Sequence, residues 1–493
     1  MTKASVIVCG YNKVQELAFC LHALTCQNFP HDYEIIVIDD GSTDATQEIV
    51  HEFALQANVR YVMPSENSQG LSVSRNTGAK LAKSSILIFL DADIVVCRNF
   101  LRAHYLAHQN PVPVVNLGLL HAVGISDKVW DRTAFLARFL NPILKLMTSQ
   151  SKIGRHLKKL WINKLHHNDC WSILNWPRAP LADWDFNDNV LLFERLHAET
   201  IFPDLRACWL RRYGKLMSLP APWALLWGGN FSICKTVLQK VGFFDERICK
   251  YGSEDIELGY RLHCEGIQFH LDINAVGFHY PHPRNTKKNR LAEEQNNHYF
   301  LKKHPTISVE FNRVFGCYNV NNKLTDVSQT LRNTRYGVYD KLCPTLLNAL
   351  PGVSNKPRII VGAGSGHLLH IIDVEYLVEG DYEKYQDLAE RYPIKIIQWL
   401  LGIGLPTEDH FFSYSLITDI WYQLCPEMRK LMLQEAMRSS DRVFLLISQE
   451  QFRNASEGHS LLKWLWKPLL QQKNMRSKGN YCLIEIERRS YGG

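Results

Sequence analysis

Several features that define other protein classes are missing from this chain of 493 residues. No apolar run is long enough to span a bilayer, and the opening stretch, MTKASVIVCGYN, has no long apolar segment of the kind found in secretion signals. The thirteen cysteines are odd in number and include no C-x-x-C pair, which argues against a disulfide framework or a zinc site. We therefore expect a cytoplasmic protein with reduced thiols.

The chain also lacks a strong excess of charge of one sign. Its 56 Lys and Arg residues against 49 Asp and Glu give a net charge of +7, with no long basic tail, so we expect no nucleic-acid partner. A hydrophobic share of 46% and a charged share of 21% are typical of folded globular protein. The length predicts two or three domains.

The first hundred residues alternate short apolar runs with helical patterns. ASVIVCGY, YEIIVIDD, VRYVMP and SSILIFLDAD read as strands, separated by segments with apolar residues at helical spacing. Strands of continuous apolar character between helices predict a mostly parallel α/β sheet that is covered on both faces. In such sheets, ligands bind at the carboxyl ends of the strands.

Acidic residues follow two of these strands, namely Asp39 with Asp40 and Asp91 with Asp93. In an extended stretch, residues i and i+2 project to the same side, so Asp91 and Asp93 could face one ion. Carboxylate oxygens suit Mg²⁺ or Mn²⁺, which commonly bridge a protein and a diphosphate. The alternative is a loop acid pair that binds no metal.

A second acid pair, Glu254 and Asp255, stands in the stretch KYGSEDIELGYRL, directly before an amphipathic helical pattern. Acids at the start of a helix are stabilised by its dipole and by free backbone N–H groups. On these residues alone, a role as a helix cap is therefore sufficient.

The motifs taken together resemble family-2 glycosyltransferases with the GT-A nucleotide-sugar-binding fold. The resemblance rests on SVIVCGYN, LHALTCQ, VIDDGSTD, GLSVSRNTGAKLA and FLDAD, in this order over 93 residues. It continues at WGGNFSICK, VGFFDERICKYGSEDIELGYRL, FHYPHPR and NNHYFLKKHP, which are similar to the C-terminal region of chondroitin-polymerase-type enzymes and galactosyltransferases. It covers residues 4–305, with 108–200 only loosely covered.

This resemblance implies that Asp255 is the catalytic base that takes the proton from the acceptor hydroxyl. Glu254 then binds the acceptor or orients Asp255. A carboxylate beside a second acid and sheltered from water has a raised pKa, which suits a base. Ser253 stands where the family usually has a second glycine, so the identity of the acceptor does not transfer.

The resemblance also implies a donor-binding set and a metal site. Asp39 resembles the uracil-binding acid with Asp40 behind it, and Asp93 the direct ligand of Mn²⁺ or Mg²⁺, while Asp91 contacts ribose or metal-bound water. His279 and His282 both fit the further metal ligand, and we prefer His279, at a strand end. The remaining donor-binding residues are Tyr11, Asn12, Arg75, Gly228, Gly229 and Asn230.

Residues 108–220 form an insertion within the predicted glycosyltransferase domain, 1–305, and we expect this region to help form the acceptor site. Its part from 132 to 168 holds eight basic and no acidic residues, with apolar residues at helical spacing. Such a stretch either contacts a membrane surface peripherally or an acidic acceptor, or packs on its own domain with solvated charges outside.

Residues 306–354 are predicted to be a linker, and 355–493 a C-terminal Rossmann-like α/β domain. The run RIIVGAGSGHLLHIID predicts a strand, a glycine-rich turn and a helix. The order of elements distantly resembles S-adenosylmethionine (SAM)-dependent methyltransferases, with Glu379 as the one candidate for a ribose-binding acid. The alternative is a structural or partner-binding domain.

The sequence as a whole predicts a metal-dependent inverting glycosyltransferase. It would transfer a hexosyl or N-acetylhexosaminyl group from a UDP-sugar to a hydroxyl acceptor, such as a glycan, in polysaccharide biosynthesis. One alternative is a bifunctional enzyme that is also a SAM-dependent methyltransferase. Another is a non-catalytic nucleotide-binding scaffold.

Overall fold

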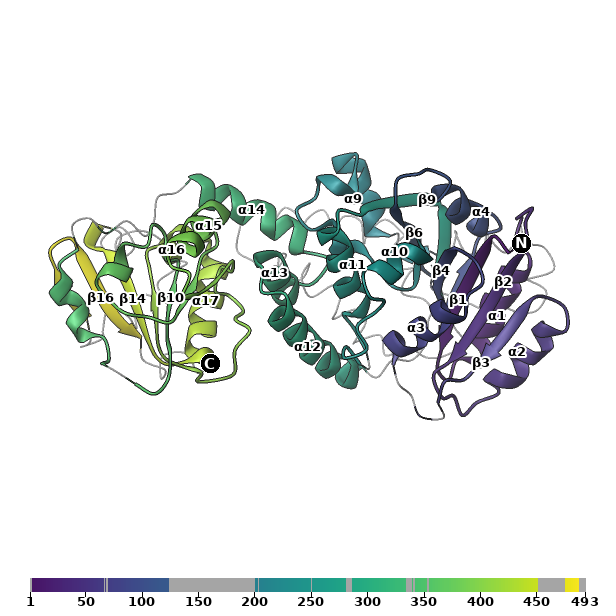
Figure 1. Ribbon diagram of the computed structural model, residues 1–493, viewed down its shortest axis with the longest axis horizontal. Helices are drawn as coiled ribbons and strands as arrows, with labels where there is room; N and C mark the ends of the chain where they lie inside the picture. Colours follow the sequence, from purple (N-terminus) through teal and green to yellow (C-terminus); the bar gives the residue numbers. More distant parts are fainter. Residues whose placement is uncertain are drawn as a thin grey trace, which may run out of the picture. The chain divides into compact units, whose positions relative to one another are not determined.

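The computed structural model describes residues 2–123 and 200–486, apart from 66, 68, 69, 203, 250, 281–285, 334–338, 340, 341, 353 and 451–474. The chain forms two compact units (Figure 1). The first consists of Met1–Ser218 with Leu226–Ala292, and the second of Leu219–Leu225 with Glu293–Gly493. The predicted basic stretch, 132–168, and His282 lie outside the described residues.

The first unit is built on a sheet with the strand order β3-β2-β1-β4-β8-β6-β9-β5, in which β7 also pairs with β6. Strands β3, β2, β1 and β4 run parallel, and β8 lies antiparallel between β4 and β6. The strands are β1 (Ala4–Gly10), β2 (Tyr33–Asp39), β3 (Val59–Val62), β4 (Ile86–Asp91), β5 (Ile94–Val96), β6 (Val114–Val123), β7 (Thr200–Phe202), β8 (Asn230–Cys234) and β9 (Gln268–His279).

The strand residues alternate between two buried faces, as continuous apolar strands predict. On one face, Val6 and Val8 of β1 pack in a core cluster with Leu17 and Leu21 of α1. On the other face, α3 approaches β1 so closely that a Cβ on Gly78 would lie 2.4 Å from Ile7. The sheet is therefore covered on both sides.

The helices of the first unit follow the strands in alternation, and α1 and α2 are visible beside β1 and β2 in Figure 1. They are α1 (Val14–Thr25), α2 (Thr46–Ala54), α3 (Leu71–Leu81), α4 (Phe100–Ala107), α9 (Leu205–Tyr213), the 3₁₀ turn η2 (Leu216–Ser218), α10 (Lys235–Lys240) and α11 (Glu254–Cys264).

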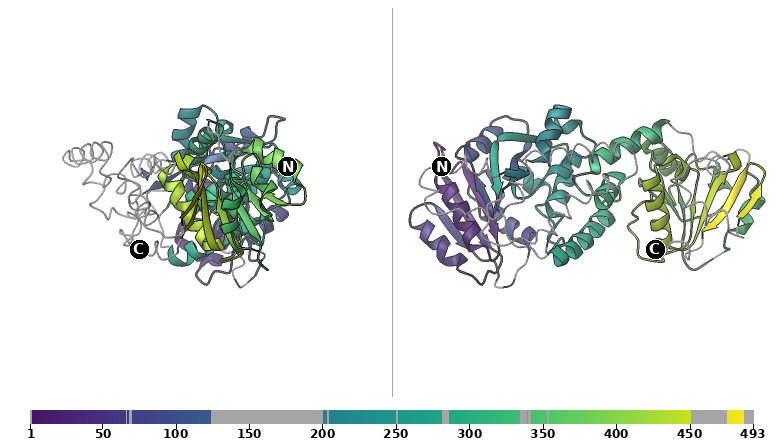
Figure 2. Two further views of the ribbon diagram at one scale, coloured as in Figure 1. Left: turned by 90° about the vertical axis from the view of Figure 1, so that its left-hand side faces the viewer. Right: turned by 180° about the vertical axis from the view of Figure 1, so that it is seen from behind.

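The second unit has its own sheet, with the order β12-β11-β10-β13-β14-β16-β15. The first five strands are parallel, and β16 runs antiparallel to β14 and β15. In the right-hand view of Figure 2, β15 and β16 are the yellow strands at one edge. The strands are β10 (Arg358–Val361), β11 (Tyr376–Val378), β12 (Ile396–Gln398), β13 (Phe412–Ile417), β14 (Ser440–Ser448), β15 (Met475–Lys478) and β16 (Tyr481–Ile486). The parallel order is that of a Rossmann-like sheet.

The stretch predicted as a linker, 306–354, contains helices α13 and α14, which belong to the second compact unit. The limits predicted for the domains stay a prediction. The helical elements here are η3 (Pro222–Leu225), α12 (Thr286–Lys303), α13 (Ile307–Phe315), α14 (Val320–Asn333), η4 (Pro344–Ala349), η5 (His367–His370), α15 (Tyr382–Arg391), α16 (Ile420–Gln423) and α17 (Pro426–Ser439).

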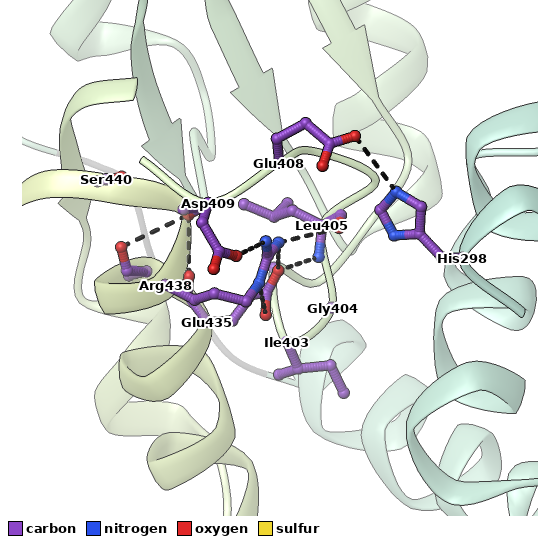
Figure 3. A network of polar contacts seen from close by, with 12 residues as sticks. His298, Ile403, Gly404, Leu405, Glu408, Asp409, Glu435, Arg438 and Ser440 are labelled. Atoms are coloured by element: carbon purple, nitrogen blue, oxygen red, sulfur yellow. Dashed lines mark hydrogen bonds and ion pairs between the residues drawn. The ribbon is translucent and has the colours of Figure 1, made fainter. Parts of the chain in front are cut away.

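The loop after β12 is held by two buried carboxylates. Glu310 of α13 accepts hydrogen bonds from the four consecutive backbone N–H groups of residues 401–404, at 2.6 to 3.0 Å. Glu435 of α17 accepts from the N–H of Leu405 and pairs with Arg438, which also donates to Asp409 (Figure 3). Both carboxylates thus satisfy backbone donors that would otherwise be buried unpaired.

Segment Leu219–Leu225 is tied into the second unit by α14. The side chain of Asn321 accepts from the N–H of Ala221 at 2.8 Å and donates to its carbonyl at 3.1 Å. Trp223 packs edge-on against Phe300, with ring centroids 5.9 Å apart.

No helix within the described ranges is both long and apolar enough to cross a membrane. None of the cysteines in those ranges is paired in a disulfide.

Candidate active site

The candidate site lies in the first unit, where the parallel strands end. In the register of the sheet, Gly10 of β1 is opposite Asp39 of β2, and Cys9 is opposite Asp91 of β4. The loops that leave these strands therefore start side by side, which brings together acids that are about 50 residues apart in the sequence.

The two acids after β2 are held by hydrogen bonds from the chain. Asp39 is almost fully buried and accepts from the N–H of Ser42 and the hydroxyl of Tyr61, each at 2.8 Å. Burial and this hydrogen bond raise the pKa of Tyr61. Asp40 accepts from the N–H of Gly70 at 3.1 Å, which fixes the start of α3.

The loop after β1 is fastened to the turn that follows β2. Asn12 has a left-handed φ of 50°, its N–H donates to Ser42 Oγ, and its side-chain oxygen accepts from the N–H of Thr43. Tyr11 beside it is 49% exposed, so its ring is available to a ligand.

Asp91 is joined to the acid pair of α11 through an arginine. Arg75 of α3 donates to Asp91 Oδ1 at 3.0 Å and to Glu254 Oε1 at 2.7 Å. The guanidinium is 2% exposed, and Glu254 is also buried. Arg75, predicted as a donor-binding residue, is therefore surrounded by carboxylates of its own chain.

The two glycines before β8 leave room for these charged groups. A Cβ on Gly228 would lie 2.5 Å from the Arg75 guanidinium, and one on Gly229 would lie 2.9 Å from Asp91 Oδ2. Asn230 is fully buried, and its side chain bonds to His104 and to the backbone within the sheet. Because its side chain is engaged in this way, Asn230 can contact a ligand through its backbone.

Asp255 sits in the first turn of α11 and reaches across to the glycine loop. Its Oδ2 accepts from the N–H of Gly228 at 2.6 Å, and its Oδ1 from the N–H of Ile256 at 2.7 Å. Burial, and next the negative charge of Glu254, raise the pKa of Asp255 from 3.8 to about 7. The side chain remains partly exposed, so a ligand can reach it.

The turn that delivers this acid pair uses two left-handed residues. Gly252 has a φ of 95° and Ser253 a φ of 74°, and the helix begins at the next residue. A left-handed conformation costs a non-glycine residue about 1–2 kcal/mol, which explains why glycine is usual at the position of Ser253.

Asp93 is the centre of a small polar cluster on the other side of Asp91. Its Oδ2 pairs with the ammonium of Lys13 and lies 3.6 Å from His279 Nε2, at the end of β9. The predicted extended geometry of residues 91–93 differs from the structure. The chain turns at Ala92, so Asp91 faces Arg75 whereas Asp93 faces Lys13.

The cluster around Asp93 fits a divalent ion in its donor set. A carboxylate oxygen and an imidazole nitrogen converge, and a cationic ammonium already stands at the carboxylate. No group of three or more metal-binding side chains is assembled anywhere in the described ranges. Water or a ligand would therefore have to complete the coordination of an ion.

Two features of the site were missed from the sequence. Lys13 follows Asn12 directly at the end of β1, which is the signal that could have placed it here. Arg206, fully buried, pairs with Asp204 and lies over the ring of Trp227, with 4.2 Å between Cζ and the ring centroid. Because Arg206 comes from the insertion, no motif indicated that it supports the residue before Gly228.

In the glycine-rich turn of the second unit, the candidate ribose-binding acid is already bound by the chain itself. Glu379 is fully buried, and its carboxylate accepts from the N–H groups of Gly364 and Asp381, at 2.7 and 2.9 Å. A Cβ on Gly362 would lie 2.3 Å from Ile420. The carboxylate proposed for a ribose thus binds its own loop, and the described residues of the second unit give no support for SAM as a cofactor.

Known proteins place the chain among the glycosyltransferases. Residues 5–172 match the family model described as glycosyl transferase family 2. The uncharacterized glycosyltransferase YfnE of Bacillus subtilis (strain 168) is 27% identical over 71% of this chain and 83% of its own length. Validoxylamine A glucosyltransferase of Streptomyces hygroscopicus subsp. limoneus is 26% identical over 84% of this chain and 83% of its own. Chondroitin synthase of Escherichia coli is 26% identical over 63% of this chain and 41% of its own.

The fold and these matches define the class of the protein. It is an α/β enzyme with a GT-A-type sheet and a second α/β unit, as the sequence predicted. The predicted resemblance to family-2 glycosyltransferases is confirmed by the family model over residues 5–172, and the chain is a glycosyltransferase, as predicted.

Proposed function

We propose that the chain is a metal-dependent, inverting glycosyltransferase that uses a UDP-sugar. It transfers a hexosyl or N-acetylhexosaminyl group to a hydroxyl of a glycan. The observation that carries this proposal is the position of Asp255, which is held by Gly228, lies next to a buried acid and has a pKa raised to about 7. A general base works best when its pKa lies near the operating pH.

Asp255 takes the proton of the acceptor hydroxyl while that oxygen attacks the anomeric carbon of the sugar. The bond between this carbon and the diphosphate oxygen breaks, and its electron pair leaves with UDP. Because the base stands on the face opposite the leaving group, the anomeric configuration inverts. Glu254, held by Arg75, orients the base and keeps its pKa raised.

The donor is bound by the loops that follow β1 and β2. Asp39 accepts a hydrogen bond from the uracil ring, and Asp40 holds the start of α3 behind it. The exposed ring of Tyr11 packs against the base, and Asn12 fixes the loop that carries it. Gly228 and Gly229, with the backbone of Asn230, allow the sugar to approach closely.

The metal site consists of Asp93 and His279, with Asp91 on the ribose side. Mn²⁺ or Mg²⁺ bound there would offset the negative charge that grows on the diphosphate. Lys13 pairs with Asp93 and would have to leave this carboxylate for an ion to bind, which would free its ammonium for the diphosphate.

The acceptor class is supported by the names of two relatives. One is named for glucosylation of validoxylamine A and another for synthesis of chondroitin. Both names are compatible with transfer to a hydroxyl acceptor, and the second agrees with a role in polysaccharide biosynthesis.

A panel of nucleotide-sugars, incubated with the full chain with and without Mn²⁺, tests the proposal without a known acceptor. We expect hydrolysis of one or more UDP-sugars only when Mn²⁺ is present, and NMR of the fresh product should show an inverted anomeric centre. A preference for another nucleotide, metal-independent turnover, or a retained configuration would each contradict it.

A further inference from the structure

The guanidinium of Arg75 touches both acids that flank the glycine loop. Its Nη2 donates to Asp91, which follows β4, and its Nη1 donates to Glu254, which begins α11. These two acids are 163 residues apart in the sequence, by subtraction of their numbers. A buried arginine with two carboxylate partners is a costly arrangement, so its placement calls for a reason.

The surroundings leave the guanidinium no freedom to move. It packs against the ring of Phe244 at 5.5 Å, and the space beside it exists only because residue 228 is glycine. Helix α3 is itself fixed to the segment before α11, because Asn76 exchanges hydrogen bonds with the backbone of Phe244 and Ser72 donates to the carbonyl of Ile248. Arg75 therefore holds a fixed distance between two parts of the site.

The neighbouring Asp255 depends on that arrangement. Its two polar contacts come from Gly228, which packs on Arg75, and from its own helix. After burial and the charge of Glu254, the positive charge of Arg75 is the next influence on the Asp255 carboxyl, and it lowers the pKa. Loss of this cation would remove the largest influence that lowers the pKa of Asp255 against burial and the charge of Glu254.

We propose that Arg75 is a positioning residue that joins the donor-side acid Asp91 to the acceptor-side pair Glu254 and Asp255, rather than a residue that contacts the nucleotide. This inference rests on the proposed function of the site. Lysine cannot take this place, because a single ammonium lacks the planar fork that reaches two carboxylates at once.

The test compares Arg75→Met and Arg75→Lys with the wild type in the hydrolysis of the UDP-sugar selected by the panel, over pH 5.5 to 9.5. In the wild type, kcat/KM should fall below an apparent pKa near 7, which is the acid limb of its pH profile. In Arg75→Met we expect this apparent pKa to rise by about one unit or more. The rate at pH 7 then falls about fivefold through protonation alone and recovers as the pH rises. Arg75→Lys should shift the limb less.

A matched control comes from the same region. Arg261→Lys disturbs another ion pair of α11, with the buried Glu257, without touching Glu254. It should lower the melting temperature and leave the acid limb in place. Calorimetric UDP affinity should change less than about threefold in both Arg75 variants, because the nucleotide does not touch residue 75.

Two outcomes would overturn the proposal. One is a loss of UDP affinity of tenfold or more with an unmoved acid limb, which would make Arg75 a donor contact. The other is a lower melting temperature with both UDP affinity and the acid limb unchanged, which would make its role structural. If no nucleotide-sugar is hydrolysed, the proposed function fails separately. The titration of the Asp255 carboxyl, followed by NMR of ¹³C-aspartate protein and assigned with Asp255→Asn, then decides whether Arg75 controls it.

Discussion

The backbone N–H of Gly228 donates to Oδ2 of Asp255 at 2.6 Å, which joins the glycine loop before β8 to the first turn of α11. A cap interaction within one helix would not need a partner 27 residues away. The contact brings the proposed base to the glycine loop, to which the proposed function assigns the donor sugar, and a helix cap alone would not require it.

Replacing Asp255 by asparagine should therefore abolish most transfer. Asparagine keeps the shape and is an equally good helix-capping residue, but it cannot accept a proton at neutral pH. We expect turnover to fall by about two to four orders of magnitude, with UDP affinity intact and the melting temperature not lowered. Asp272→Asn, within strand β9, is the control. Near-normal turnover of Asp255→Asn would show that this residue is a helix cap and not the catalytic base.

The carboxyl of Asp255 should also make the stability of the chain depend on pH. Since its pKa is higher in the folded state, the folded chain holds more protons than the unfolded chain between pH 3.8 and about 7. This group therefore makes the free energy of unfolding decrease as the pH rises through that window. Denaturant unfolding of Asp255→Asn at several pH values should show a smaller decrease than the wild type, and identical slopes would contradict the raised pKa.

Asp93→Ala should remove the dependence of UDP binding on the metal. The carboxylate of Asp93 converges with His279, and the mutation deletes the oxygen ligand that the proposed metal site takes from this residue. Calorimetry of UDP with and without Mn²⁺ measures the effect, and His279→Ala should show a weaker form of it. A variant that still gains UDP affinity from Mn²⁺ would refute the assignment of Asp93.

Lys13→Met should strengthen binding of the bare ion. The Lys13 ammonium pairs with Asp93, so an incoming cation would have to displace it. Loss of a partly exposed ion pair worth about 1 kcal/mol corresponds to about fivefold tighter Mn²⁺ binding. Electron paramagnetic resonance of free Mn²⁺ in the absence of nucleotide reports this affinity. Weaker binding in Lys13→Met would mean that the lysine assists the ion.

In the second unit, Glu310→Ala should be strongly destabilising. Four backbone N–H groups lose their acceptor, and each buried donor left unpaired costs about 1–3 kcal/mol. We expect a loss of about 4 kcal/mol or more, and a smaller loss for Glu310→Gln, which keeps one acceptor oxygen. Thermal and denaturant unfolding check this. An effect below about 1 kcal/mol would show that water replaces the carboxylate.

The sequence predicted the parts of the site that depend on strand ends and motifs. Asp39 and Asp91 come together because continuous apolar strands form a parallel sheet, and Asp255 starts a helix because Gly252 and Ser253 turn the chain there. What depends on packing across the chain could not be predicted. The turn at Ala92 separates the two acids of the DAD motif, and only the packed structure shows that Arg75 is enclosed by acids.

The chain enters the second unit at Leu219 and returns to the first at Leu226. This path, through segment Leu219–Leu225, has a consequence for the order in which the chain folds during synthesis. The segment belongs to the second unit, but its partner Asn321 leaves the ribosome 100 residues later than Ala221. At typical synthesis rates of about 5–20 residues per second, that interval lasts about 5–20 seconds. Until α14 has emerged, the side chain that pairs with both backbone groups of Ala221 is missing, so this part of the second unit can be completed only late, although the segment itself was made early.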